Sequence, residues 1–261
     1  MQPDWLTRAS AMPWPVTSPF RMRPNLEKLD TVAPALLLRD ELAEIYRRER
    51  ERVMAAHPER AVVGTPNAEA LAAIRDLAPS PQEDFVILKQ DGDTLRTEYL
   101  SVCFPSRWDP REKLGLDFTA IHAPVADNQT LIAAGQSIMT MAFMKQPMMR
   151  HVWLVVPSAS LDQHPDKNEA WWTEALRDMS PLLTNLFFRV ERQTTWPLPQ
   201  FQRAVFFIRV MTSPLVEVLA SVPGRAPELA ASLRSMTPEV VAYRGMREAM
   251  PRLLAELDHF E

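Results

Sequence analysis

Two neighbouring stretches decide the fold: Asn185–Gln193, NLFFRVERQ, and Arg203–Met211, RAVFFIRVM. Both are rich in aromatic and β-branched residues, which favour extended backbone. The connection between them contains Pro197 and Pro199. The two stretches predict two long strands, and Phe206–Ile208 is typical of a strand buried on both faces.

These strands carry charge where apolar residues would be expected. Because side chains alternate along a strand, Arg189, Glu191 and Gln193 should share one face. Arg209 lies within the apolar second strand, and an unpaired buried charge is costly. Its partner is expected to be Glu191 or the carboxylate of a ligand.

Upstream, the pattern predicts a β-hairpin and then a helix. Phe85–Gln90 and Thr94–Cys103 flank Asp91-Gly92, a dipeptide typical of tight hairpin turns. Residues 104–126 contain three prolines and predict an ordered loop or a short broken helix. Asp127 or Asn128 is expected to cap a helix that continues to about Phe143.

The remaining elements are mostly helical. Residues 1–34, rich in Pro and Trp, predict an extended arm packed on the protein. Helices are expected over 37–57, over 67–78 with Asn67 as its cap, over 168–179, and in pieces from Ser213 onward. His151–Val156 is expected to be a strand. The charged face of the first helix is expected to be solvated.

This order predicts a mixed α/β (α+β) protein with an antiparallel sheet. A PAS-like sheet is compatible with the order, although the order alone does not select it. We expect one structural unit in three parts: an N-terminal arm and helices (1–80), a core (81–212) and C-terminal helices (213–261).

Composition excludes several functions. The chain has 261 residues, a net charge of −4 and no long basic stripe, so nucleic acid is not an expected partner. Its single cysteine, Cys103, cannot form an internal disulfide. No secretory signal or membrane-spanning run is visible, which predicts a cytoplasmic protein with no membrane partner. Common metal, nucleotide and hydrolase motifs are absent.

Several short strings, taken in order, resemble the heme-dependent oxidative N-demethylase family over about residues 18–220. They are Cys103-Phe-Pro-Ser-Arg-Trp108, Lys113-Leu-Gly115, Ile121-His-Ala-Pro-Val125, Arg189-Val-Glu-Arg-Gln-Thr194 and Phe206-Phe-Ile-Arg209. Similar proteins tend to have Arg-x-Asn-Trp where this chain has Arg150-His-Val-Trp153.

The resemblance implies a PAS-like core that holds heme b and oxidises a small secondary amine with O2, releasing formaldehyde. It also implies a separate flavin and iron–sulfur reductase, and with it a possible hetero-oligomer. This chain has no flavin or iron–sulfur motif of its own.

The resemblance also implies residue roles. His122 is expected to ligate the heme iron, with a hydrogen-bonded structural histidine as the alternative and His151 as the fallback ligand. Cys103 could supply a thiolate, but a lone cysteine near a strand end is more often a small buried residue.

Other residues are expected around the cofactor and the amine. Glu191 is the candidate to bind and deprotonate the amine, with Arg189 beside it, and a structural salt bridge is the alternative. The candidate partners of the heme propionates are Arg107, Lys113 and Arg209. Trp108 is expected either to form a wall of the pocket or to pack in the core.

Two other functions remain open from the sequence. A PAS-like heme protein could be a sensor, although no output domain is visible. The chain could also be a heme-free structural subunit, which the replacement of Asn by Val152 favours.

Overall fold

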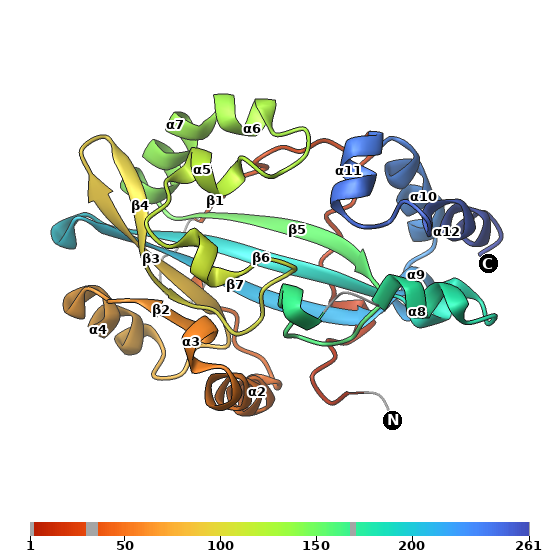
Figure 1. The fold of residues 1–261 in the computed structure, drawn as a ribbon, viewed down its shortest axis with the longest axis horizontal. Helices are drawn as coiled ribbons and strands as arrows, with labels where there is room; N and C mark the ends of the chain where they lie inside the picture. The colour runs from red at the N-terminus through yellow and green to blue at the C-terminus, as the bar shows by residue number, and fades with distance from the viewer. Residues whose placement is uncertain (1–2, 30–35, 168–170, 261) are drawn as a thin grey trace.

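The computed structural model of the chain describes residues 3–29, 36–167 and 171–260, and centres on one seven-stranded sheet. The strand order is β1-β5-β6-β7-β3-β4-β2, with every neighbouring pair antiparallel. The strands are β1 (Glu27–Lys28), β2 (Val62–Gly64), β3 (Asp84–Asp91), β4 (Thr94–Ser101), β5 (Met148–Val156), β6 (Phe187–Leu198) and β7 (Arg203–Pro214). This confirms the predicted mixed α+β class (Figure 1).

The two predicted long strands are present as β6 and β7, and they lie side by side in the middle of the sheet. β6 pairs with β7 along its whole length, from Phe187 opposite Pro214 to Leu198 opposite Arg203. β6 continues past the predicted end at Gln193 and includes Pro197. Proline has no backbone N–H to donate to a neighbouring strand. At Pro197 this causes no loss on the β5 side, because β5 pairs with β6 only as far as Thr194.

The two faces of β6 differ as the alternation predicts. Phe188 and Val190 pack into a large apolar core formed with the C-terminal helices and with Trp14 and Phe20 of the N-terminal arm. The opposite face of β6 carries Arg189 and other buried polar side chains. This face of β6 therefore carries a row of buried polar side chains, Arg189, Glu191, Gln193 and Thr195.

The predicted hairpin is confirmed. β3 and β4 pair antiparallel, with Asp91 opposite Thr94, and Gly92 adopts the left-handed φ of +59° that the tight turn requires. β3 also pairs with β7, which joins the hairpin to the central strands.

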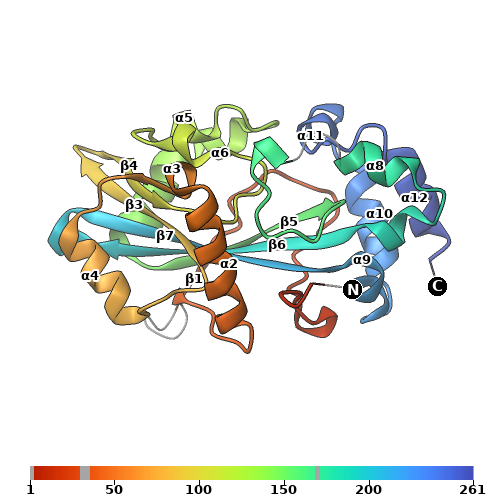
Figure 2. The same ribbon diagram turned by 60° about the horizontal axis from the view of Figure 1, so that its bottom comes forward.

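Helices and short turns cover both faces and one end of the sheet, as Figures 1 and 2 show. Residues of α6, α7 and the π-helical segment η3 pack on the sheet face that includes Val86 and Leu88, whereas α4 packs on the face that includes Phe85 and Ile87. Helices α8 to α12 gather at one end of the strands. The helical segments are η1 (Ala9–Ala11), α2 (Ala43–Ala56), α3 (Pro58–Ala61), α4 (Ala68–Leu77), η2 (Pro110–Lys113), α5 (Phe118–His122), α6 (Gln129–Ala133), α7 (Gly135–Ile138), η3 (Met139–Lys145), η4 (Pro165–Lys167), α8 (Trp171–Arg177), η5 (Leu182–Asn185), η6 (Pro199–Phe201), α9 (Leu215–Ala220), α10 (Arg225–Arg234), α11 (Pro238–Tyr243) and α12 (Met250–Asp258).

Two helices differ from the prediction. α2 begins at Ala43 rather than 37, and its charged face is not wholly solvated, because Arg50 is buried against Asp84. The helix predicted to end near Phe143 is broken into three segments. Of the two expected caps, Asn128 occupies the N-cap position, but its side-chain amide donates to backbone carbonyls of the preceding turn. The Asp127 carboxylate accepts instead from the Thr237 hydroxyl.

The predicted helix over 168–179 is present as α8 from Trp171, and its first three residues lie outside the described part of the chain. The helix over 67–78 is present as α4, with the Asn67 side chain accepting from the Ala70 N–H at 2.8 Å as predicted. Among the described residues, no helix combines the length and apolarity needed to cross a bilayer.

Candidate functional site

A chain of hydrogen bonds crosses the polar face of the sheet from the loop after β4 to β5. The Ser106 hydroxyl donates to Oε1 of Glu191, and Gln193 Nε2 donates to Oε2 of Glu191 at 2.7 Å. Arg150 Nε in turn donates to Gln193 Oε1 at 2.6 Å. Glu191 and Gln193 are only 6% and 7% exposed, so this network is part of the interior.

Arg189 anchors the buried end of this network. Its Nε donates to the Ser106 hydroxyl at 2.8 Å, and its terminal nitrogens donate to the carbonyls of Phe104, Ser160 and Leu161. Burial lowers the pKa of Arg189 to about 10, so the guanidinium remains charged at neutral pH. Because all three nitrogens are bonded to protein, Arg189 fixes two loops on β6 and orients Ser106.

His122 ends α5 and is partly buried against Phe118. Its Nδ1 lies 2.7 Å from the Phe118 carbonyl, and the two rings are 4.1 Å apart between centroids. A carbonyl only accepts, so Nδ1 carries the proton and Nε2 holds the lone pair. A histidine that ligates a metal commonly donates its other ring N–H to a backbone carbonyl in this way.

Two further observations describe the state of His122. Burial, aided by the nearby positive charges of Arg150 and Lys113 and opposed by the hydrogen bond to the Phe118 carbonyl, lowers the pKa of His122 to about 4. The imidazole is therefore neutral at pH 7. No described residue bonds to Nε2, and this atom is not among the fully buried unpaired polar atoms, so it is at least partly exposed.

Arg150 was missed as a site residue. Only its Nε has a hydrogen-bond partner among the described residues, and its terminal nitrogens are likewise not among the fully buried unpaired atoms. The register pairs Arg150 with Gln193, so strand alternation could have placed it on the polar face once β5 and β6 were known to pair. The sequence alone gave no reason to choose that pairing.

The other residues predicted to bind the cofactor lie in different surroundings. Lys113 is close enough to His122 for its charge to lower the histidine pKa, and Trp108 packs between two apolar clusters near α5 and α2. Arg107 has a left-handed φ of +67°, and its Nη1 donates to the Arg244 carbonyl at 3.1 Å. Its guanidinium therefore lies against the loop after α11.

Arg209 does not belong to this site. It lies on the sheet face opposite Glu191, donates to Asp40 at 2.8 Å and stacks 3.6 Å from the centroid of the Tyr46 ring. The expected pairing of Arg209 with Glu191 is therefore wrong, because adjacent strands align Arg209 with Arg192. His151, the fallback ligand, also lies on the opposite face from Arg150 on the same strand.

Cys103 is a buried structural residue. Its side chain is inaccessible, and burial raises its pKa to about 12, so it is a neutral thiol. The Asp84 carboxylate accepts from its backbone N–H at 2.8 Å. This matches the expected small buried residue and does not provide a thiolate.

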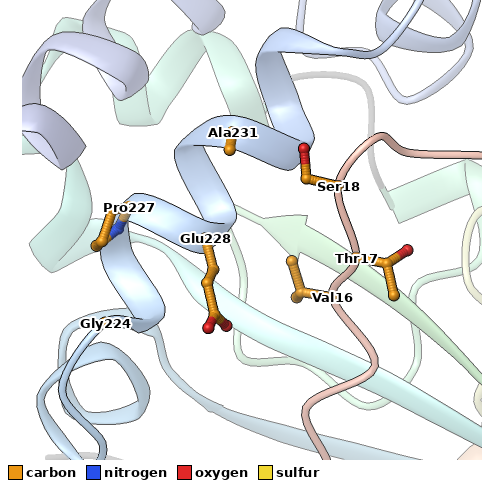
Figure 3. Close-up of a pocket in the computed structure, with 7 residues that line it drawn as sticks. All are labelled: Val16, Thr17, Ser18, Gly224, Pro227, Glu228 and Ala231. Carbon is orange, nitrogen blue, oxygen red and sulfur yellow. The ribbon is translucent and has the colours of Figure 1, made fainter.

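Two surface depressions lie apart from the polar face. A groove of about 650 Å³ separates Val16–Ser18 of the arm from α10, and Figure 3 shows its lining. Its carboxylate, Glu228, already accepts from the Trp14 indole at 2.8 Å. The second depression, of about 350 Å³, is lined by residues that include Arg107 and Trp172.

The donor set can accommodate a heme. The described residues contain no cluster of three His, Cys, Asp or Glu side chains placed to hold a metal ion. A heme iron has its four equatorial ligands in the porphyrin and needs only an axial one from the protein. A neutral imidazole with an accessible Nε2, with cations nearby, fits that requirement.

Fold and site together define an α+β protein that buries a charged, hydrogen-bonded cluster on one face of an antiparallel sheet. The neutral imidazole of His122 lies close to this cluster. Residues 30–254 match the family model described as haem-dependent oxidative N-demethylase, alpha subunit-like. The match spans most of the chain, so the chain belongs to this family. The comparison with curated proteins found no match.

Proposed function

We propose that this chain is the heme-binding subunit of an oxygenase that demethylates a small secondary amine. Family membership supports heme dependence and N-demethylation. The observation that carries the proposal to this chain is the neutral His122 imidazole, with its proton held on Nδ1 and its Nε2 accessible.

The proposed cradle uses residues on one side of the sheet. His122 would hold the iron of heme b through Nε2, Trp108 would line the cofactor, and Lys113 would supply positive charge for a propionate. Arg107 can join them only by turning from the Arg244 carbonyl. Arg209 has no part in this cradle because it faces the other side of the sheet.

Bound heme would supply O2 activation with two electrons from outside the chain. The balanced reaction converts dimethylamine, O2, two electrons and two protons to methylamine, formaldehyde and water. In this balance one oxygen atom would be transferred to the methyl carbon, whose C–N bond would then break, and the other would leave as water. The electrons must come from another polypeptide, because one cysteine cannot hold an iron–sulfur cluster. The family description as alpha subunit-like supports such a partner.

Glu191 is the residue we assign to the amine. A protonated secondary amine would donate a charge-assisted hydrogen bond to its carboxylate, which can then take the proton and free the nitrogen lone pair. Ser106 and Gln193 hold one carboxylate oxygen each, so the group is fixed before the amine arrives. Arg189 acts through Ser106 and is a positioning residue.

The test compares wild-type protein with Glu191→Gln after heme reconstitution. We expect equal heme content, an amine-induced shift of the Soret band weakened about tenfold in the variant, and loss of formaldehyde release from dimethylamine. Glu69→Gln, on the exposed first turn of α4, is the control for loss of a carboxylate. Amine binding and turnover unchanged in Glu191→Gln would refute the assignment.

The same assay distinguishes the proposed oxygenase from the alternative function, a heme-based sensor. A reconstituted protein that forms a stable ferrous–O2 complex, given reductant and amine, and releases no formaldehyde would be a sensor and not an oxygenase.

A further inference from the structure

Arg150 has no carboxylate partner among the described residues, whereas four other partly or fully buried arginines of the sheet region do. Arg50 pairs with Asp84, Arg60 with Asp162, Arg203 with Glu98 and Arg209 with Asp40. Arg189 also lacks a carboxylate partner, but its three nitrogens donate hydrogen bonds to three backbone carbonyls and to the Ser106 hydroxyl. Arg150 alone in this comparison keeps both terminal nitrogens unpaired within the described chain.

The nearest carboxylate does not fill this role. Glu191 is separated from Arg150 by Gln193, and each oxygen of Glu191 already accepts a hydrogen bond from another residue. The Nε bond to Gln193 fixes the plane of the Arg150 guanidinium. Its two terminal nitrogens therefore form a preset fork that no described residue occupies and that is not fully buried.

A fixed guanidinium fork matches the two oxygens of a carboxylate and binds them through two parallel hydrogen bonds. A partly buried guanidinium without such a partner is costly, which favours a ligand that completes the pair. The Arg150 guanidinium is also close enough to His122 for its charge to lower the pKa of the imidazole, which places both groups in the same part of the molecule.

We propose that Arg150 is the carboxylate-binding residue of this site. The inference rests on the proposed function and adds that the site also binds a carboxylate group of its ligand. Two ligands could supply the carboxylate: a heme propionate, or an amine substrate that carries its own acid group, such as an N-methyl amino acid with its ammonium on Glu191.

The experiment uses three full-length proteins: wild type, Arg150→Gln, and Arg48→Gln as a control. Arg48 lies on the solvent side of α2, with a side chain 56% exposed. Arg150→Lys keeps the charge but loses the fork, and serves as the second variant if Arg150→Gln does not fold by circular dichroism. Each protein is titrated with heme, with heme dimethyl ester, and, after reconstitution, with N-methylglycine and dimethylamine, following the Soret band.

Two results support the inference and distinguish the sources. If a propionate is the ligand, Arg150→Gln binds heme at least about tenfold more weakly and binds the dimethyl ester as wild type does. If a substrate carboxylate is the ligand, heme binding is unchanged, and Arg150→Gln loses affinity for N-methylglycine but not for dimethylamine. Arg48→Gln should match wild type throughout.

Unchanged affinity of Arg150→Gln for all four compounds would overturn the inference. Wild-type protein that binds no heme would instead refute the proposed function. In that case, calorimetric titration with acetate and N-methylglycine tests carboxylate binding by Arg150 independently of heme. About tenfold weaker binding in Arg150→Gln supports the carboxylate site, and equal or undetectable binding in both proteins overturns it.

Discussion

The depressed pKa of His122 predicts a specific pH dependence of stability. In the folded protein this pKa is about 4, against an ordinary value of 6.5. Between these values the unfolded chain binds a proton that the folded chain does not, so acidification favours unfolding. The stabilisation is present above pH 6.5 and is lost as the pH falls toward 4.

The magnitude follows from these two pKa values. Lowering the pH from 7 to 5 should remove about 2 kcal/mol of the free energy of unfolding through His122. His151, whose pKa burial also lowers, acts in the same direction, and carboxylates contribute near pH 5. The contribution of His122 is therefore the difference between wild type and His122→Gln, which cannot titrate.

The assay is urea unfolding of heme-free protein at pH 7, 6 and 5, followed by tryptophan fluorescence. Wild type should lose about 2 kcal/mol more than His122→Gln across this range. Parallel losses in the two proteins would show that His122 is not buried as a neutral imidazole, and would refute this reasoning.

Three further predictions concern the supporting structure. Asp84→Asn should lower the free energy of unfolding by about 3–5 kcal/mol in urea titrations, because it removes the partner of the buried Arg50; a loss under 1 kcal/mol would contradict this. Gly64→Ala should cost about 1–3 kcal/mol, because its φ is +86° and a Cβ would lie 2.3 Å from a backbone oxygen of β4. Gly92→Ala, also at positive φ but in open space, should cost less, and the reverse order of melting temperatures would disprove the clash. Cys103, with a pKa raised to about 12, should react with a thiol reagent at pH 8 only after urea unfolding; rapid labelling of native protein would place it at the surface.

Much of the sheet could be predicted because its signals are local. The alternation along Phe187–Gln193 specified which residues share a face, and Asp91-Gly92 specified a hairpin turn. The Asn67 cap was equally local, since its side chain bonds three residues ahead.

The predictions that were wrong or missed share a physical cause, because each depends on contacts between residues far apart in the sequence. Arg209 could not be assigned to Asp40 without knowing that residues 169 positions apart meet on the far face of the sheet. The position of Arg150 on the polar face depends on the pairing of β5 with β6. The end of β6 was predicted too early because the sequence does not show where β5 stops pairing with it. The buried side of α2 depends on Asp84 of β3.

The central claim is that His122 is the protein ligand of a heme iron. The most direct measurement is the absorption spectrum of heme-reconstituted wild type and His122→Gly, each with and without added imidazole. We predict a Soret band with stoichiometric heme in wild type, its loss or large shift in His122→Gly, and its recovery when imidazole enters the vacated space. A wild-type spectrum that persists unchanged in His122→Gly, or a wild-type protein that takes up no heme, would contradict the account.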